Sequence, residues 1–426
     1  MATLRTQQFH PIFHVILLCY AAIIGDGAGT RGDNGDGSSS PRYLQANDHI
    51  VDLISNTDVL TSSQALLVYR DEQQQSTTPC NSPSTNWIRT QVRNISDEDL
   101  TNFFDWKVYT LPFVYKLFVE EKGIYDIEYI GKDGKYTQEI TSILEQAQSF
   151  WSDTGVNDDI RVLGAHGSDL ADLHNNLIPS LEVLFGTTSY HQNGDDDEDY
   201  TIVDHAMDIQ DLISRLPGGY DNPLLTFNAF ATDDDEDDMN DYPSIIIGDG
   251  YFEFQESIGH EAEGPEYALT HEHAHHLQFS LNTPEERSQQ SARRQELMAD
   301  ALSAYFLAHE RGLDMTTNEI SNIRQIAYSA GDCETKNDGH HGTPRQRRCA
   351  TAWGASLSQD DNYANYNLVE LKNRFNSWYE KVDYLDESCQ HHFIMATSKA
   401  FIARHQTVQY ILQAVIVVAL SFGVAI

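Results

Sequence analysis

The sequence predicts an α+β protein. Segments rich in Val, Tyr, Phe and Ile indicate strands at 107–120 and 124–130, with a turn at 131–134. Apolar residues at helical spacing predict an amphipathic helix over Thr137–Trp151. Two later segments, Tyr267–Phe279 and Arg293–Phe306, also have helical composition. With 426 residues, 40% of them hydrophobic, the chain can bury one large core or two smaller ones.

The charge of the chain excludes one class of partner. Lysine and arginine total 27 against 65 aspartate and glutamate residues, a formal net charge of −38. A surface this negative repels phosphate backbones, so we expect no nucleic-acid partner.

The N-terminal 29 residues have the order of a secretory signal peptide. Arg5 precedes an apolar stretch over 12–24, and small residues follow at 25–29. A buried or membrane-anchoring helix is the alternative. Residues 30–42 are rich in Gly, Asp and Ser, which predicts a flexible leader. The oxidising compartment that secretion implies favours disulfides among the remaining cysteines, and we expect Cys333 to pair with Cys349 because they are close in sequence.

The C-terminal segment, residues 396–426, has the features of a membrane-attachment signal. Small residues at 396–398 and a polar-containing spacer precede an apolar stretch that runs from Tyr410 to Ile426. This is the layout of a signal exchanged for a glycolipid anchor. A tail-anchored helix and an ordinary buried helix are the alternatives. Together the two ends predict an extracellular or cell-surface protein, anchored in the membrane through its tail.

Two runs of acidic residues interrupt the region 43–240, which we expect to form the N-terminal part of the ectodomain. The runs, 195–199 and 233–238, lie between apolar stretches and predict solvated loops. Calcium binding there is an alternative, although Asp238 stands where a calcium loop of the EF-hand type needs glycine.

The residues with metal-binding chemistry lie in the predicted core domain, residues 241–395. The segment His271–His275 reads His-Glu-x-x-His. On a helix, residues i and i+4 share a face, so His271 and His275 can bind one metal ion with Glu272 beside it. The alternative is a surface helix crowded with histidines, on which His273 and His276 point away from the metal face.

A third ligand is expected on the second helix. Glu296 lies 21 residues after His275, on a helix whose apolar stripe includes Leu297 and Ala301. Glu296 can ligate the metal, and Asp300 can hydrogen-bond the far nitrogen of a ligand histidine. In isolation, an ordinary solvated acidic face would be the simpler interpretation of this pair.

These motifs resemble a family. His-Glu-x-x-His followed by Glu-x-x-x-Asp is the pattern of the gluzincin metallopeptidases. More narrowly, residues 268–278, 296–301 and the loop 341–347 together are similar to the bacterial neutral zinc metallopeptidase family, although Pro344 stands where that family has serine. The resemblance covers about 80 residues and implies a zincin-like fold, with a mixed sheet over an active-site helix and a second helix carrying Glu296. It extends to 115 residues if Ser244–Phe252 is the edge strand that lies beside an extended peptide.

The expected function is zinc-dependent hydrolysis of peptide bonds in a protein or peptide substrate. One Zn²⁺ held by His271, His275 and Glu296 would acidify a water molecule, from which Glu272 takes a proton. His341 or His340 could stabilise the oxyanion, or both could be surface loop residues. Arg347 could pair with an acidic residue of the fold. Two alternatives are a zinc-stabilised protein without catalysis and an acidic cation-binding surface protein.

Overall fold

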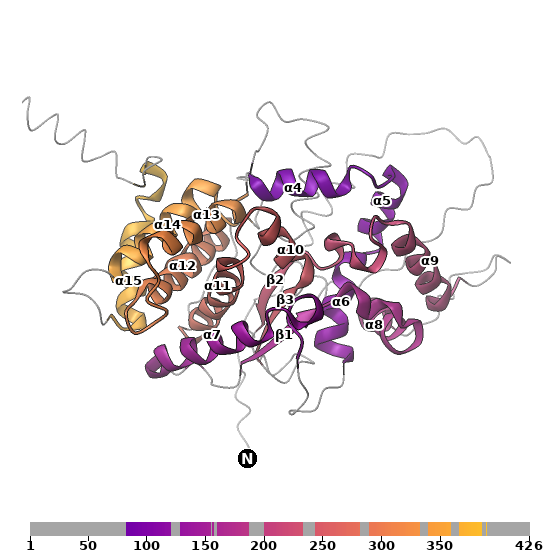
Figure 1. The fold of residues 1–426 in the computed structure, drawn as a ribbon, viewed down its shortest axis with the longest axis horizontal. Helices are drawn as coiled ribbons and strands as arrows, with labels where there is room; N and C mark the ends of the chain where they lie inside the picture. Colours follow the sequence, from indigo (N-terminus) through magenta and orange to yellow (C-terminus); the bar gives the residue numbers. More distant parts are fainter. Residues whose placement is uncertain are drawn as a thin grey trace, which may run out of the picture. The chain divides into compact units, whose positions relative to one another are not determined.

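The computed structural model describes residues 82–120, 128–154, 156, 160–186, 200–232, 243–281, 289–332, 340–358, 366–385 and 389. The chain divides into two compact units, residues 1–371 and 372–426. The first unit holds a mostly helical fold with one small sheet (Figure 1). The predicted α+β class is therefore confirmed, although helices predominate.

The first half of this unit contains helices, short 3-10 and π turns, and two strands. In chain order these are α4 (Pro83–Val92), α5 (Asp97–Asp105), η1 (Val108–Thr110), α6 (Leu111–Val114), η2 (Tyr115–Val119), η3 (Lys132–Gly134), α7 (Thr137–Phe150), η4 (Ser152–Thr154), β1 (Arg161–Ala165), η5 (Gly167–Ala171), η6 (Leu173–Leu177), α8 (Ile178–Phe185), α9 (Ile202–Arg215), η7 (Gly219–Asp221), η8 (Pro223–Leu225) and β2 (Ala229–Thr232).

The second half is helical after one strand. Its elements are β3 (Ser244–Gly248), α10 (Asp249–Ser257), α11 (Glu263–Ser280), α12 (Gln289–Ala308), α13 (Thr317–Ala330) and α14 (Pro344–Ser358). The boundary between the two units falls within α15 (Leu368–Tyr379), and the second unit also contains η9 (Val382–Tyr384).

The sheet has three strands in the order β1-β3-β2. β1 runs parallel to β3, with Arg161 opposite Ser244, and β2 runs antiparallel to β3, with Ala229 opposite Ile247. The sheet is therefore mixed. β3 is its central strand, so the expectation that Ser244–Phe252 forms an edge strand is wrong. Residues 249–252 of that segment lie in α10.

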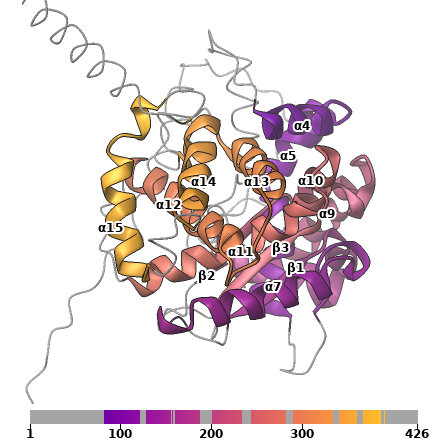
Figure 2. The ribbon, with the colours of Figure 1, turned by 60° about the vertical axis from the view of Figure 1, so that its left-hand side comes forward.

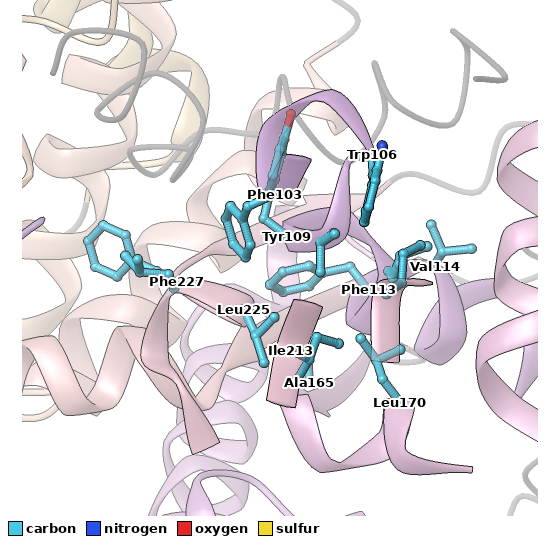
Figure 3. Close-up of a cluster of buried hydrophobic side chains, with 14 of the residues drawn as sticks. Phe103, Trp106, Tyr109, Phe113, Val114, Ala165, Leu170, Ile213, Leu225 and Phe227 are labelled. Atoms are coloured by element: carbon cyan, nitrogen blue, oxygen red, sulfur yellow. The ribbon is translucent and has the colours of Figure 1, made fainter. Parts of the chain in front are cut away.

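A large apolar cluster fills the space between one group of helices and the sheet. It takes side chains from α4, α5, α6, α8 and α9 and from the strands (Figure 3). Phe113 of α6 lies with its ring centroid 5.5 Å from that of Phe230 in β2. Burial of these side chains supplies most of the driving force for folding this region.

The segment 107–120 is helical, so the prediction of a strand there is wrong. Its aromatic and β-branched residues are buried in η1 and α6 and partly buried in η2. A short helix buried on nearly every side has the same apolar composition as a buried strand, so periodicity does not separate the two. In the other predicted strand, the structure describes 128–130 and finds no strand there, while 121–127 lie outside the described residues.

The other predicted helices are confirmed. α7 matches the predicted helix at 137–151 and buries Ile140, Ile143 and Ala147 on one face. α11 and α12 cover the two segments with metal-binding residues. The turn at 131–134 is also confirmed, with positive φ at Gly131 and Gly134.

Three helices pack together beside the sheet and bring the polar residues into one place. α11 packs against β2, β3 and α12, and α12 packs along α14 (Figures 1 and 2). Gly354 of α14 faces α12 so closely that an added Cβ would lie 2.0 Å from the carbonyl oxygen of Ala301. Glycine at this position therefore sets the separation of α12 and α14.

One disulfide joins Cys349 to Cys389, so the expected pairing of Cys333 with Cys349 is wrong. Proximity in sequence was not a sufficient guide, because folding brings distant cysteines together. The predicted signal peptide, leader, acidic runs and C-terminal anchor segment lie outside the described residues. Within the described ranges, no helix has both the length and the apolar character that crossing a membrane requires.

Candidate metal centre

Helix α11 is buried on nearly every side. All residues from Tyr267 to Leu277 are buried, including His271, Glu272 and His275, which are at most 1% exposed. The alternative of a surface helix crowded with histidines is therefore excluded. Polar groups buried to this degree need hydrogen bonds or ions as partners, because removing them from water is costly.

Three potential ligand atoms converge between α11 and α12. The Nε2 atoms of His271 and His275 lie 3.2 Å apart. Glu296 Oε2 lies 3.4 Å from His271 Nε2, and Glu296 Oε1 lies 3.8 Å from His275 Nε2. These three residues could hold a metal ion. The i, i+4 spacing on α11 and the close packing of α12 bring them together.

Asp300 orients His271. Its Oδ1 atom lies 3.2 Å from His271 Nδ1, one helical turn beyond Glu296 on α12. Burial lowers the pKa of His271 to about 4, so its imidazole is neutral at pH 7. A carboxylate that can only accept faces Nδ1, and the Arg347 guanidinium, which can only donate, lies 3.5 Å from Nε2, so the proton of the neutral ring is assigned to Nδ1 and the lone pair to Nε2.

Gln278 is the hydrogen-bond partner of His275. Gln278 Oε1 lies 3.1 Å from His275 Nδ1, and Gln278 Nε2 donates to the backbone oxygen of Gln295 at 2.8 Å. Sequence reasoning gave Gln278 no role, although it lies three residues beyond His275 and so on the same side of the helix. That spacing was the available signal.

Arg347 of α14 ties the two acidic residues of α12 together. Its Nη1 donates to Glu296 at 2.8 Å, and its Nε and Nη2 donate to Asp300 at 2.6 and 2.9 Å. Nη2 also donates to the hydroxyl of Tyr267 and lies 3.5 Å from His271 Nε2. Burial raises the pKa of Asp300, but Arg347 and His271 outweigh it and hold that pKa below its usual value. The prediction that Arg347 pairs with an acidic residue is confirmed.

The formal charges of this buried group do not cancel. Glu272, Glu296 and Asp300 carry three negative charges when ionised, and Arg347 carries one positive charge, so with neutral imidazoles the group has a net charge of −2. A buried excess of charge is strongly unfavourable without a counterion. A divalent cation would balance it.

Glu272 lies on α11 beside the first histidine and is fully buried. Tyr251 of α10 is its neighbour: burial raises the pKa of the Tyr251 hydroxyl, and the charge of Glu272 raises it further. Glu272 is therefore close enough to Tyr251 for its charge to act on that hydroxyl.

His340 and His341 are buried, which excludes the alternative that they are surface loop residues. They precede α14 and share Asp332: His340 Nδ1 lies 2.5 Å from one carboxylate oxygen, and the backbone N–H of His341 donates to the other at 2.7 Å. The Nδ1 atom of the His341 side chain lies 3.5 Å from Asp332 Oδ2. Gly342, with φ of 100°, brings this loop against Leu297 and Arg347.

His273 and His276 are also buried on α11 but are not among the three residues that could hold a metal ion. His276 takes part in a hydrogen bond with the backbone of Ser244 in β3. Burial lowers the pKa of both, to about 4 for His273 and about 3 for His276. Both are therefore neutral at pH 7, and His276 links α11 to β3.

Comparisons of this chain with protein-family models, with curated proteins and with solved structures find no match.

Proposed function

We propose that this protein is a zinc-dependent endopeptidase, with His271, His275 and Glu296 as the metal ligands. One observation carries the proposal. Acceptor oxygens of Asp300 and Gln278 face the two Nδ1 atoms, and Arg347 Nη2 faces His271 Nε2, so two Nε2 lone pairs and a carboxylate meet in one buried space. Lone pairs this close repel each other unless a cation lies between them.

The donor set favours zinc. Two imidazole nitrogens and one carboxylate oxygen form the three-ligand set of hydrolytic zinc sites, which leaves a position open for water. When bound, zinc would supply a Lewis acid that polarises a peptide carbonyl and acidifies water. Its two positive charges would also match the net charge of −2 in the buried group.

The residues of the chain would then carry the proton transfers. Glu272, adjacent to His271, accepts a proton from the attacking water at its carboxylate and passes it to the nitrogen of the leaving amine. A donor for the developing oxyanion would come from the loop before α14. Both His341 and His340 are candidates there, and Asp332 holds the ring of His340 through Nδ1, with Nε2 turned away from that carboxylate.

Access to this site requires movement. His271, His275, Glu272 and Glu296 are each at most 1% exposed. A peptide bond therefore reaches Glu272 only when the packing around α11 opens. Enzymes commonly combine such opening with exclusion of water during the reaction.

The same burial favours a second candidate, a zinc-stabilised protein without catalysis. Structural zinc sites are closed, whereas catalytic sites keep one position open to substrate. Such a protein would need the three ligands but not Glu272. Removing the Glu272 carboxylate therefore separates the two candidates.

The proposed setting follows from the ends of the chain. We propose that the protein enters the secretory pathway and acts at the cell surface or outside the cell, held by a glycolipid anchor or a membrane tail. Its proposed partner is a protein or peptide substrate. The disulfide between Cys349 and Cys389 supports an oxidising compartment.

Cleavage of a mixed peptide library by the purified full chain tests the proposal. Glu272→Gln should lower the cleavage rate by about 10²- to 10⁴-fold and leave zinc binding intact, because it removes only the general base. Prolonged treatment with a chelator should abolish cleavage, and added zinc should restore it.

Glu266→Gln is the matched control, because it makes the same change on the same helix outside the ligand cluster. It should cleave at the rate of the wild type. Equal cleavage by wild type and Glu272→Gln would contradict the catalytic proposal. Zinc binding without cleavage by the wild type would support the structural candidate.

A further inference from the structure

We infer that Gln278 is a positioning residue that holds His275 in the tautomer required for metal binding and couples this ligand to the helix that carries Glu296. This inference rests on the proposed metal site. Nothing in the His-Glu-x-x-His pattern itself requires a glutamine at this position.

The orientation of the Gln278 amide follows from its two partners. One partner is the backbone oxygen of Gln295, which lies 2.8 Å from Gln278 Nε2. A carbonyl oxygen can only accept a hydrogen bond. The amide NH₂ must therefore point toward Gln295. The amide oxygen then faces His275 Nδ1 at 3.1 Å, so Nδ1 must be the donor and Nε2 the acceptor.

Gln278 also joins the two ligand helices. Gln295, whose carbonyl accepts from Gln278, directly precedes Glu296 on α12. The hydrogen bonds from His275 to Gln278 and from Gln278 to Gln295 thus connect a proposed ligand on α11, His275, to the residue next to a proposed ligand on α12. That second ligand is Glu296. A displacement of α12 would move the Gln278 amide and therefore rotate the ring of His275.

The two histidines are held by different chemistry. His271 Nδ1 lies 3.2 Å from the carboxylate of Asp300, which is charged and paired with Arg347, whereas His275 Nδ1 donates to a neutral amide. A neutral acceptor fixes the tautomer without adding another negative charge to a group that already has three carboxylates. This explains why an amide suits the position beside His275.

The test compares Gln278→Leu and Gln278→Glu with the wild type in the full chain. Zinc affinity is measured by competition with a chromophoric chelator. Gln278→Leu should bind zinc about 10- to 100-fold more weakly, the usual loss when a partner of a ligand histidine is removed. Gln278→Glu should recover part of this affinity, because a carboxylate still accepts from Nδ1 but cannot donate to the Gln295 carbonyl. Ser280→Ala, at the same end of α11, should bind zinc like the wild type, because the Ser280 hydroxyl donates to the backbone carbonyl of Leu277 and not to a ligand.

A second readout follows the tautomer directly. In metal-free protein labelled with ¹⁵N, the wild type and Gln278→Glu should show a protonated Nδ1 on His275, and Gln278→Leu should show a mixture of tautomers. A purely structural role would instead lower the thermal midpoint of the metal-free protein in both variants and leave the tautomer unchanged.

The outcomes separate this inference from the proposed function. Wild-type affinity and tautomer in Gln278→Leu would overturn the inference and leave the peptidase proposal intact. A folded wild type that binds no zinc would overturn both. Weak zinc binding in Gln278→Leu with no cleavage by the wild type would keep the inference and refute the peptidase.

Discussion

Two regions of this protein are buried to a similar degree and are held together by different forces. The apolar cluster, to which α4, α5, α6, α8, α9 and the strands contribute, consists of aliphatic and aromatic side chains (Figure 3). The interface of α11, α12 and α14 buries carboxylates, imidazoles and a guanidinium instead. In the first region each contact is weak and replaceable, because dispersion and the hydrophobic effect are not directional. In the second, each polar group depends on one named partner.

The difference supports the polar interface as the candidate site. Burying three carboxylates with one arginine costs more free energy than filling the same space with leucine. A gain in the stability of the folded protein therefore does not explain this arrangement. The polar interface is therefore best explained by function, and the apolar cluster by stability. Substitutions in the two regions should separate these two properties.

The largest effect on stability is expected from Arg347→Met. This change leaves Glu296 and Asp300 buried without their cation, and breaking a buried ion pair in this way costs about 3–5 kcal/mol. Urea denaturation in the presence of a chelator measures the loss. Arg347→Lys keeps the charge but not the forked geometry, so its loss should be smaller. Equal stability of Arg347→Met and wild type would mean that the ion pairs do not matter in solution.

A smaller effect is expected from Ile209→Val in the apolar region. Ile209 of α9 is fully buried, and removing one methylene group from such a position costs about 0.5–1.5 kcal/mol. Zinc affinity should not change, since the substitution touches no residue of the metal centre. A change in zinc affinity would show that the two regions are coupled and would break the comparison.

The smallest effect is expected from Glu266→Gln and depends on pH. Burial, with Glu139, Glu263 and Glu319 nearby, raises the pKa of Glu266 to about 7. Between its ordinary value near 4.5 and about 7, the folded protein holds a proton that the unfolded chain releases. Wild-type stability should therefore fall as pH rises through this window, and the contribution is lost above about pH 7.

Glu266→Gln should remove this part of the pH dependence, because glutamine does not ionise. Chemical denaturation of both proteins from pH 4.5 to pH 8 measures it. Parallel curves for the variant and the wild type would show that the Glu266 carboxyl has its ordinary pKa in the folded protein.

The sequence was a good guide to long helices and a poor guide to short buried segments. α7 has a clear helical period over 14 residues, so its position was predictable. The segment 107–120 has no such period, because its short helices are buried on several sides. The place of β3 in the centre of the sheet depends on pairing with β1, about 80 residues away, which local patterns do not reveal.

The same distinction applies to the candidate metal centre. His271, His275 and Glu296 could be proposed because regular helices put residues four apart on one face. Gln278 was missed, because its role depends on a carbonyl of another helix. Arg347 was expected to pair with an acidic residue, but its simultaneous contact with Glu296 and Asp300 depends on how α14 packs along α12.

The enclosure of the candidate metal centre has a kinetic consequence if a metal ion binds there. An ion bound by ligands that are at most 1% exposed exchanges with solvent only when the surrounding helices part. The rate of exchange is then the rate of that opening, whatever the concentration of competing ions or chelators outside. A metal acquired during folding would accordingly stay with the molecule for long periods, even where zinc in the surroundings is scarce.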